Sequence, residues 1–173
     1  MSEQSSTVAG HTDEVDRLVS AWRRERPDLD VSPLEVLSRV TRLARHLDRA
    51  RRTAFAERGI ETWEFDVLSA LRRAGSPYQL SPGQLLTQTL VTSGTMTNRI
   101  DRLAAKGLVV RGPDPNDRRG VLVRLTDSGR ELTDAALTSL LKNERELLSA
   151  LPEPRLGALA DLLRELTVQF EAE

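Results

Sequence analysis

The 173-residue chain has no cysteine, few aromatic residues (3%) and no long hydrophobic run. The lack of cysteine excludes disulfide bonds, thiolate metal sites and sensing through thiol oxidation. A membrane-spanning helix needs about 20 apolar residues in succession, and no stretch approaches that length. Residues 1–10 are small and polar, without the basic start and apolar centre of a signal peptide. We therefore expect a cytoplasmic protein with a disordered tail over residues 1–10 and no membrane partner.

Motifs for catalysis and metal binding are also missing from the sequence. There is no Gly-rich phosphate loop, no His-Glu-x-x-His pair and no nucleophile elbow, so we predict that the chain is not an enzyme and uses no cofactor. The two histidines, His11 in the tail and His46 in an expected helix, are too few for a typical zinc site. These absences favour a binding protein without a metal.

The net charge of −1 conceals an uneven distribution of charged residues. Residues 92–125 carry seven basic and three acidic side chains, a balance of +4, whereas residues 126–173 carry five basic and ten acidic ones, a balance of −5. Because salt screens charges beyond roughly 8–10 Å, a local basic zone matters more for phosphate binding than the sum over the chain. Nucleic acid is therefore a candidate partner.

The spacing of apolar residues predicts a mainly helical fold with one small β-hairpin. Helices are expected from Thr12 to Arg24, from Pro33 to about Phe55 and from Trp63 to Arg73, with Thr12 and Ser32 as caps. A helix of barely two turns begins after Ser81, which is predicted to form a capping box with Gln84. The hairpin strands are "LVVR" and "VLVRL", and "GPDPNDRRG" is expected to be a loop between them.

Leucine-rich helices with broad apolar faces flank a compact middle section over residues 62–125. Residues 11–57 are expected to hold an extra helix and a dimerisation helix, and residues 126–173, beginning at the cap Thr126, two more dimerisation helices. One chain could not easily cover all these apolar faces, so we infer a homodimer whose interface is formed by both ends of the chain.

Within the middle section, a short capped helix, a tight turn and a helix with a polar leading edge predict a helix-turn-helix. The second helix, which begins near Thr92, would enter the major groove of double-stranded DNA. Asn98 could read adenine, and Arg102 could read guanine or hold phosphate. The residues expected to contact DNA from this motif are Ser81, Thr92, Ser93, Thr95, Thr97, Asn98 and Arg102.

The hairpin is expected to act as a wing on this motif, with Asp117, Arg118 and Arg119 at its tip. An arginine at a narrow loop tip can enter the minor groove, where the potential is most negative. Asp117 could orient the neighbouring guanidinium through a paired contact. The alternative is a helical interaction protein that does not bind DNA, with a solvated arginine-rich turn. Such a protein would show no salt-dependent DNA affinity.

The stretch "SPGQL…VTSGTMTNRIDRLAAKGLVVRGPDPNDRRGVLVRLTDSGREL" resembles the MarR family of bacterial winged-helix regulators. The "DRR" of the wing matches the family's D-x-R motif, and "LTDSGREL" matches its strand-to-helix junction. The resemblance implies a winged helix-turn-helix lobe over residues 62–125 and an obligate dimer that grips a pseudo-palindromic operator. It also implies a repressor that a small-molecule effector releases from DNA.

The extra N-terminal helix with "VSAWRRERPDLD" is similar to the urate-responsive, PecS/HucR-like branch of that family. That branch binds its ligand with one Trp, one Asp and two Arg side chains, and the matching positions here are Trp22, Asp66, Arg99 and Arg111. The resemblance implies a small anionic aromatic effector, with urate as the best match and another purine or a phenolic acid as alternatives. The sequence does not choose among them.

Each of these four residues also has a purely structural explanation. Trp22 fits a core or interface aromatic, and Asp66 would complement a helix dipole. Arg99 could contact DNA, and Arg111 could pair with a neighbouring aspartate. As an effector site, the set has a physical logic, since a Trp face and two guanidinium groups suit a planar anion. We expect Asp66 to pair with Arg99 until an anion competes for that arginine.

Overall fold

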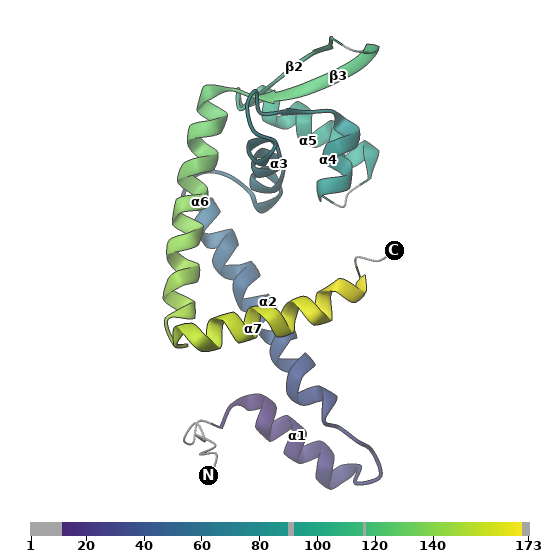
Figure 1. Cartoon of the computed structure of the whole chain (residues 1–173), viewed down its shortest axis with the longest axis vertical. Helices are drawn as coiled ribbons and strands as arrows, with labels where there is room; N and C mark the ends of the chain where they lie inside the picture. Colours follow the sequence, from purple (N-terminus) through teal and green to yellow (C-terminus); the bar gives the residue numbers. More distant parts are fainter. Residues whose placement is uncertain (1–11, 90–91, 116, 171–173) are drawn as a thin grey trace. The chain divides into compact units, whose positions relative to one another are not determined.

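The computed structural model (Figure 1) describes residues 12–89, 92–115 and 117–170, without the side chain of Arg118. The tail predicted to be disordered, residues 1–10, lies outside the described residues. The chain divides into two compact units, Met1–Arg49 and Ala50–Glu173. None of the described helices has both the length and the apolar character needed to cross a bilayer.

The first unit consists of α1 (Glu14–Glu25) and most of α2 (Pro33–Ala56). Val15 and Val19, one turn apart on α1, are buried against Val31 and Leu34. Asp13 caps α1, not Thr12 as predicted, because Asp13 and Asp16 form a reciprocal capping box. The Asp13 carboxylate accepts a hydrogen bond from the Asp16 backbone N–H at 3.0 Å, and the Asp16 carboxylate accepts one from the Asp13 backbone N–H at 2.8 Å.

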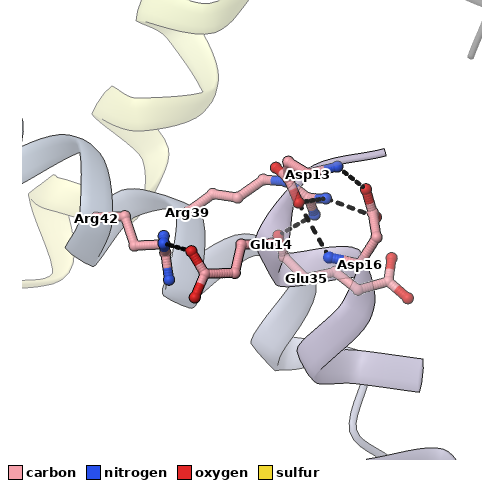
Figure 2. Close-up of polar contacts among 6 residues, drawn as sticks. All are labelled: Asp13, Glu14, Asp16, Glu35, Arg39 and Arg42. Atoms are coloured by element: carbon pink, nitrogen blue, oxygen red, sulfur yellow. Dashed lines mark hydrogen bonds and ion pairs between the residues drawn. The ribbon is translucent and has the colours of Figure 1, made fainter. Parts of the chain in front are cut away.

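Ion pairs fasten α1 to α2 around this small apolar contact (Figure 2). Arg39 of α2 lies 2.8 Å from Asp13 and 2.7 Å from Asp16, and Arg42 pairs with Glu14. The hydrogen bond from Arg39 is the main reason that the pKa of Asp13 falls to about 2. The first unit is therefore a helical hairpin held by few apolar contacts and several exposed charged ones.

The predicted capping box of Ser32 and Glu35 is wrong. The Ser32 hydroxyl donates to Asp30 at 3.1 Å, and the Glu35 carboxylate accepts from Arg23 of α1 at 2.5 Å. Glu35 thus links α2 to α1 through Arg23. At the start of α2, the Asp30 carboxylate accepts the hydrogen bonds of Ser32.

The second unit contains α3 (Thr62–Arg73), α4 (Pro82–Thr89) and α5 (Ser93–Ala105) packed beside a small antiparallel sheet. Its strands are β1 (Gln79–Leu80), β2 (Val109–Asp114) and β3 (Asp117–Leu125), in the order β1-β3-β2. One apolar core joins the helices to the sheet. Its largest buried members are Val67, Leu68, Leu71, Leu85, Met96, Ile100, Leu103, Val109 and Val123. The expected fold class, mainly α with a β-hairpin wing, is confirmed.

The β-hairpin of β2 and β3 differs from the prediction in two ways. Strand β1 is not indicated by the sequence pattern, although it adds Gln79 and Leu80 to the sheet beside β3. The segment predicted as a long loop is mostly strand, because β2 continues through Pro113, which faces Val121 of β3. Proline is tolerated there because β2 is an edge strand and needs no second partner for its backbone.

Two long helices complete the second unit. Thr126 caps α6 (Asp127–Leu148) as predicted, since its hydroxyl accepts the Gly129 N–H at 3.0 Å. The end of α2, the start of α3 and the middle of α6 share a second apolar cluster, whose members are Phe55, Ile60, Phe65, Ala136 and Leu140. The last helix, α7 (Glu153–Thr167), is followed by a single 3-10 turn, η1 (Val168–Phe170). In the described structure, α7 buries none of its own side chains.

Candidate nucleic-acid interface

Helix α5 has one buried face and one exposed face. Met96, Ile100 and Leu103 point into the core, as their spacing of three to four residues predicts. Thr95, Asn98 and Arg102 lie on the exposed side. The core therefore fixes the rotation of α5 about its axis, and the polar side chains are presented to solvent together.

The start of α5 and the start of α4 differ in how they are capped. At α4 the predicted capping box is confirmed: Ser81 Oγ accepts the Gln84 N–H at 3.2 Å, and Gln84 Oε1 accepts the Ser81 N–H at 2.8 Å. At α5 the Thr92 hydroxyl lies 3.0 Å from the Thr95 hydroxyl instead of bonding to the helix backbone. Backbone N–H groups at this exposed helix start are oriented for an anion such as phosphate.

The hairpin of β2 and β3 extends past α5 in the second unit (Figure 1), with Asp117 and Arg119 exposed near its tip. Asp117 Oδ1 accepts the backbone N–H of Arg119 at 2.9 Å. Asp117 thus shapes the tip through a bond to the backbone, and the paired contact with a guanidinium group that the sequence suggested stays a prediction. The side chain of Arg118 lies outside the described part of the structure.

Two residues at the start of α3, missed by the sequence analysis, contact the exposed side of α5. The carboxylate of Glu61 accepts a hydrogen bond from Trp63 Nε1 at 2.9 Å and one from Arg102 at 2.6 Å. These two bonds, the Trp63 one first, lower the pKa of Glu61 below its usual value. The Trp63 ring lies 4.7 Å from the Arg102 guanidinium and 5.3 Å from that of Arg99.

This cluster borders an open depression of about 530 Å³ on the second unit. Its lining comes from the start of α3 and from the exposed side of α5: Glu61, Trp63, Gly94, Thr95, Asn98, Arg99 and Arg102. Two arginines and one asparagine beside an aromatic ring can bind phosphate groups and base edges. Three of the residues expected to contact DNA, Thr95, Asn98 and Arg102, thus share one surface with the two residues that the sequence analysis missed.

Asp66 lies on the next turn of α3 and is surrounded by three arginines. Its ion pair is with Arg51 at 3.8 Å, rather than with Arg99 as expected, while Arg99 and Arg73 act on it through their charge. Burial is the strongest influence and raises the pKa of Asp66, against the three arginines. A second depression, of about 220 Å³, opens beside Asp66 and is bordered by Arg51 and Arg73.

The other two residues of the expected effector site have different surroundings. Arg111 of β2 pairs with Asp101 of α5 at 2.8 Å and also donates to the Thr97 carbonyl at 3.3 Å. It therefore joins the wing to α5, which is a structural role. Trp22 belongs to the first unit, where it lies on the exposed side of α1 with 48% of its surface accessible. The structure describes this unit separately from the one that holds the other three residues.

Comparison of the sequence with known proteins shows to which family the chain belongs. Residues 58–120 match the MarR family. The transcriptional regulator PecS of Dickeya dadantii is 39% identical over 150 residues, which cover 87% of this chain and 90% of PecS. The chain belongs to the MarR family of transcriptional regulators. The repressor NicR of Pseudomonas putida is 31% identical over 80% of this chain and 88% of NicR.

Solved structures of MarR regulators share the same fold. A mutant of Escherichia coli MarR complexed with operator DNA aligns with a TM-score of 0.66 at 29% identity, over 80% of this chain and 99% of that one. A MarR family regulator from Streptomyces coelicolor aligns with a TM-score of 0.68 at 25% identity, over 82% of this chain and 97% of that one. In the part of this MarR chain that the structure describes, no group of three acidic or histidine side chains could hold a metal ion.

Proposed function

We propose that this MarR-family chain is a repressor that binds a pseudo-palindromic operator as a homodimer and releases it when a small anionic aromatic ligand binds. The observation that carries the proposal is the joint exposure of Thr95, Asn98 and Arg102 on α5, in the unit that also holds the arginine-tipped hairpin. In a winged helix-turn-helix, this helix enters the major groove and the wing reaches the flanking minor groove. The complex of Escherichia coli MarR with operator DNA supports the same use of the fold here.

Exposed apolar side chains on both units support a homodimer. On α2 of the first unit, Val36, Leu37 and Val40 are 40–56% exposed. At the end of the second unit, Leu162, Leu166 and Phe170 are 44–84% exposed. Faces of this kind normally lie within an interface, and two-fold symmetry would place the two α5 helices about one DNA turn apart, roughly 34–36 Å.

The effector proposal is supported by the charges around Asp66. Arg51, Arg73 and Arg99 surround a single half-buried carboxylate, so the local charge is positive and favours an anion. Trp22 presents an exposed aromatic face on which a planar ligand could stack. Arg111 would supply a further guanidinium only by leaving its ion pair with Asp101. We propose urate as the effector because it is a planar anion near neutral pH. Another purine or a phenolic acid is the alternative.

Two substitutions on the proposed DNA surface should have different effects. Arg119→Ala should weaken binding to all DNA sequences alike, because it removes a charge at the wing and no contact with a base edge. The slope of log affinity against log salt concentration should decrease by about one. Asn98→Ala should instead reduce discrimination at one base position, by about 1–3 kcal/mol. Gel-shift titrations against the upstream DNA of the gene and its single-base variants would measure both. If the two variants bind every sequence as the wild type does, α5 and the wing do not form the interface.

Asp66→Asn and Arg99→Ala test the effector site. Both changes alter the balance between one carboxylate and its arginines, so we expect urate to release DNA from neither variant at concentrations that release it from the wild type. The measurement is the DNA dissociation constant with and without urate. Asp48→Asn, a change of the same kind on α2 of the first unit, is a matched control and should leave release unchanged. Wild-type release by urate in both Asp66→Asn and Arg99→Ala would rule out this site.

A further inference from the structure

Trp63 connects two arginines that the proposed function assigns to different tasks. Both arginines line the depression proposed to face DNA, but only Arg99 also acts electrostatically on Asp66 in the proposed effector site. Both guanidinium groups lie within cation–π distance of the Trp63 ring, at 5.3 and 4.7 Å. The ring is itself held in place, because its Nε1 donates to Glu61 and its apolar part packs against the core of the second unit.

The two arginines share one ring. A tryptophan attracts a cation through its quadrupole, and two cations near one ring also repel each other. While Arg99 is near the ring, this repulsion weakens the hold of Trp63 and Glu61 on Arg102. An anion bound beside Asp66 would attract Arg99 away from the ring and remove the repulsion. Arg102 would then be held more firmly by Glu61, 2.6 Å away.

We infer that Trp63 is a positioning residue that couples effector binding to DNA release, by exchanging its contact with Arg99 for a tighter hold on Arg102. This inference rests on the proposed function. This exchange makes the effector's contacts differ between the DNA-free and DNA-bound states of the protein. Without such a difference, a ligand cannot shift DNA affinity. The exchange also explains why Glu61, an acid, stands beside a surface proposed to bind phosphate: Glu61 retains Arg102 when the repressor is released.

The first test measures how strongly urate weakens DNA binding in Trp63→Leu and Trp63→Phe. Coupling factors between two ligands are typically about 5–150-fold. We expect the factor to fall to about 1–2 in Trp63→Leu, while urate and DNA each still bind alone, and to an intermediate value in Trp63→Phe, whose ring attracts cations less strongly. Tyr78→Leu is the matched control, because Tyr78 packs on the same core and lies 4.9 Å from Arg72, which is not on α5. It should keep the wild-type factor.

The second test needs no effector. The DNA affinities of Arg99→Met, Arg102→Met and the double variant form a thermodynamic cycle, measured with Trp63 present and with Trp63→Phe or Trp63→Leu. We expect the effects of the two arginine changes to be non-additive by roughly two-fold or more with Trp63, less so in Trp63→Phe, and additive within error in Trp63→Leu. Equal non-additivity in every folded Trp63 variant would overturn the inference, as would an unchanged urate factor.

The outcomes separate the inference from the function on which it depends. If the wild type does not bind DNA, the proposed repressor function fails, and the inference fails with it. If the wild type binds DNA but does not respond to urate, the effector proposal fails, and the cycle alone decides whether Trp63 couples the two arginines. If urate weakens DNA binding by the same factor in the wild type and in both Trp63 variants, only the inference is wrong. Should Trp63→Leu fail to fold, the result for Trp63→Phe decides both tests.

Discussion

Gly129→Ala is expected to lower the free energy of unfolding by about 2–3 kcal/mol, because α6 begins in direct contact with the backbone after α5. A Cβ at Gly129 would lie 2.0 Å from the Leu108 carbonyl oxygen and 3.2 Å from Leu125 Cδ2. That carbonyl cannot easily move away, since it accepts the Thr126 N–H at 3.1 Å. The added methyl group must therefore displace either the first turn of α6 or the start of the sheet.

Chemical denaturation at a fixed protein concentration would measure this loss, since the stability of a dimer depends on concentration. Gly83→Ala is the matched control. Its Cβ would meet only Ser81 Oγ at 3.8 Å, an ordinary contact, and alanine favours a helix more than glycine does. Gly83→Ala should leave stability unchanged or raise it slightly. A loss below about 1 kcal/mol in Gly129→Ala would show that the junction is looser than the structure indicates.

Lys106→Met should destabilise the second unit by about 2 kcal/mol, through the buried carboxylate of Glu64. Glu64 is fully buried on α3, and Lys106 Nζ lies 2.6 Å from one of its oxygens and 2.8 Å from the other. Removing one partner of a buried ion pair typically costs about 3–5 kcal/mol. We expect less here, because Lys106 is 42% exposed and Glu64 also accepts the Glu61 N–H at 2.9 Å.

The double variant Glu64→Leu, Lys106→Met separates this explanation from a simple loss of packing. Replacing both members of a buried pair with apolar side chains is often neutral, so the double variant should recover most of the stability lost in Lys106→Met. Lys142→Met, at an exposed position on α6, is the control and should have little effect. If the double variant were less stable than Lys106→Met alone, the buried charge would not be the cause.

Two similar motifs show how far local sequence determines this fold. "SPGQ" and "SPLE" both predict a capping box, and only Ser81 and Gln84 form one. At the other site, Arg23 comes from a different helix and takes the carboxylate of Glu35. Helix starts are thus predictable from sequence only where no side chain from elsewhere in the fold competes for the capping group.

The strands and the site are only partly predictable, because some of their features depend on contacts with distant parts of the chain. The hairpin follows from the sequence, but its length does not, because Pro113 indicates a loop until its place on an edge strand is known. The polar face of α5 follows from helical spacing alone. Glu61 and Trp63 do not, since they contact Arg102 from about forty positions earlier in the chain, and no local pattern indicates such a contact. The individual contacts with DNA and effector stay predictions.

Joint binding of duplex DNA by α5 and the wing is tested most directly by one affinity measurement. The full-length protein is titrated with the DNA upstream of its gene across salt concentrations, and its affinity is compared with that for unrelated DNA of the same length. We predict a specific complex of two protomers whose affinity falls steeply as salt rises, and whose salt dependence decreases in Arg119→Ala. Equal affinity for both DNAs, or an affinity that does not change with salt, would contradict this role of α5 and the wing.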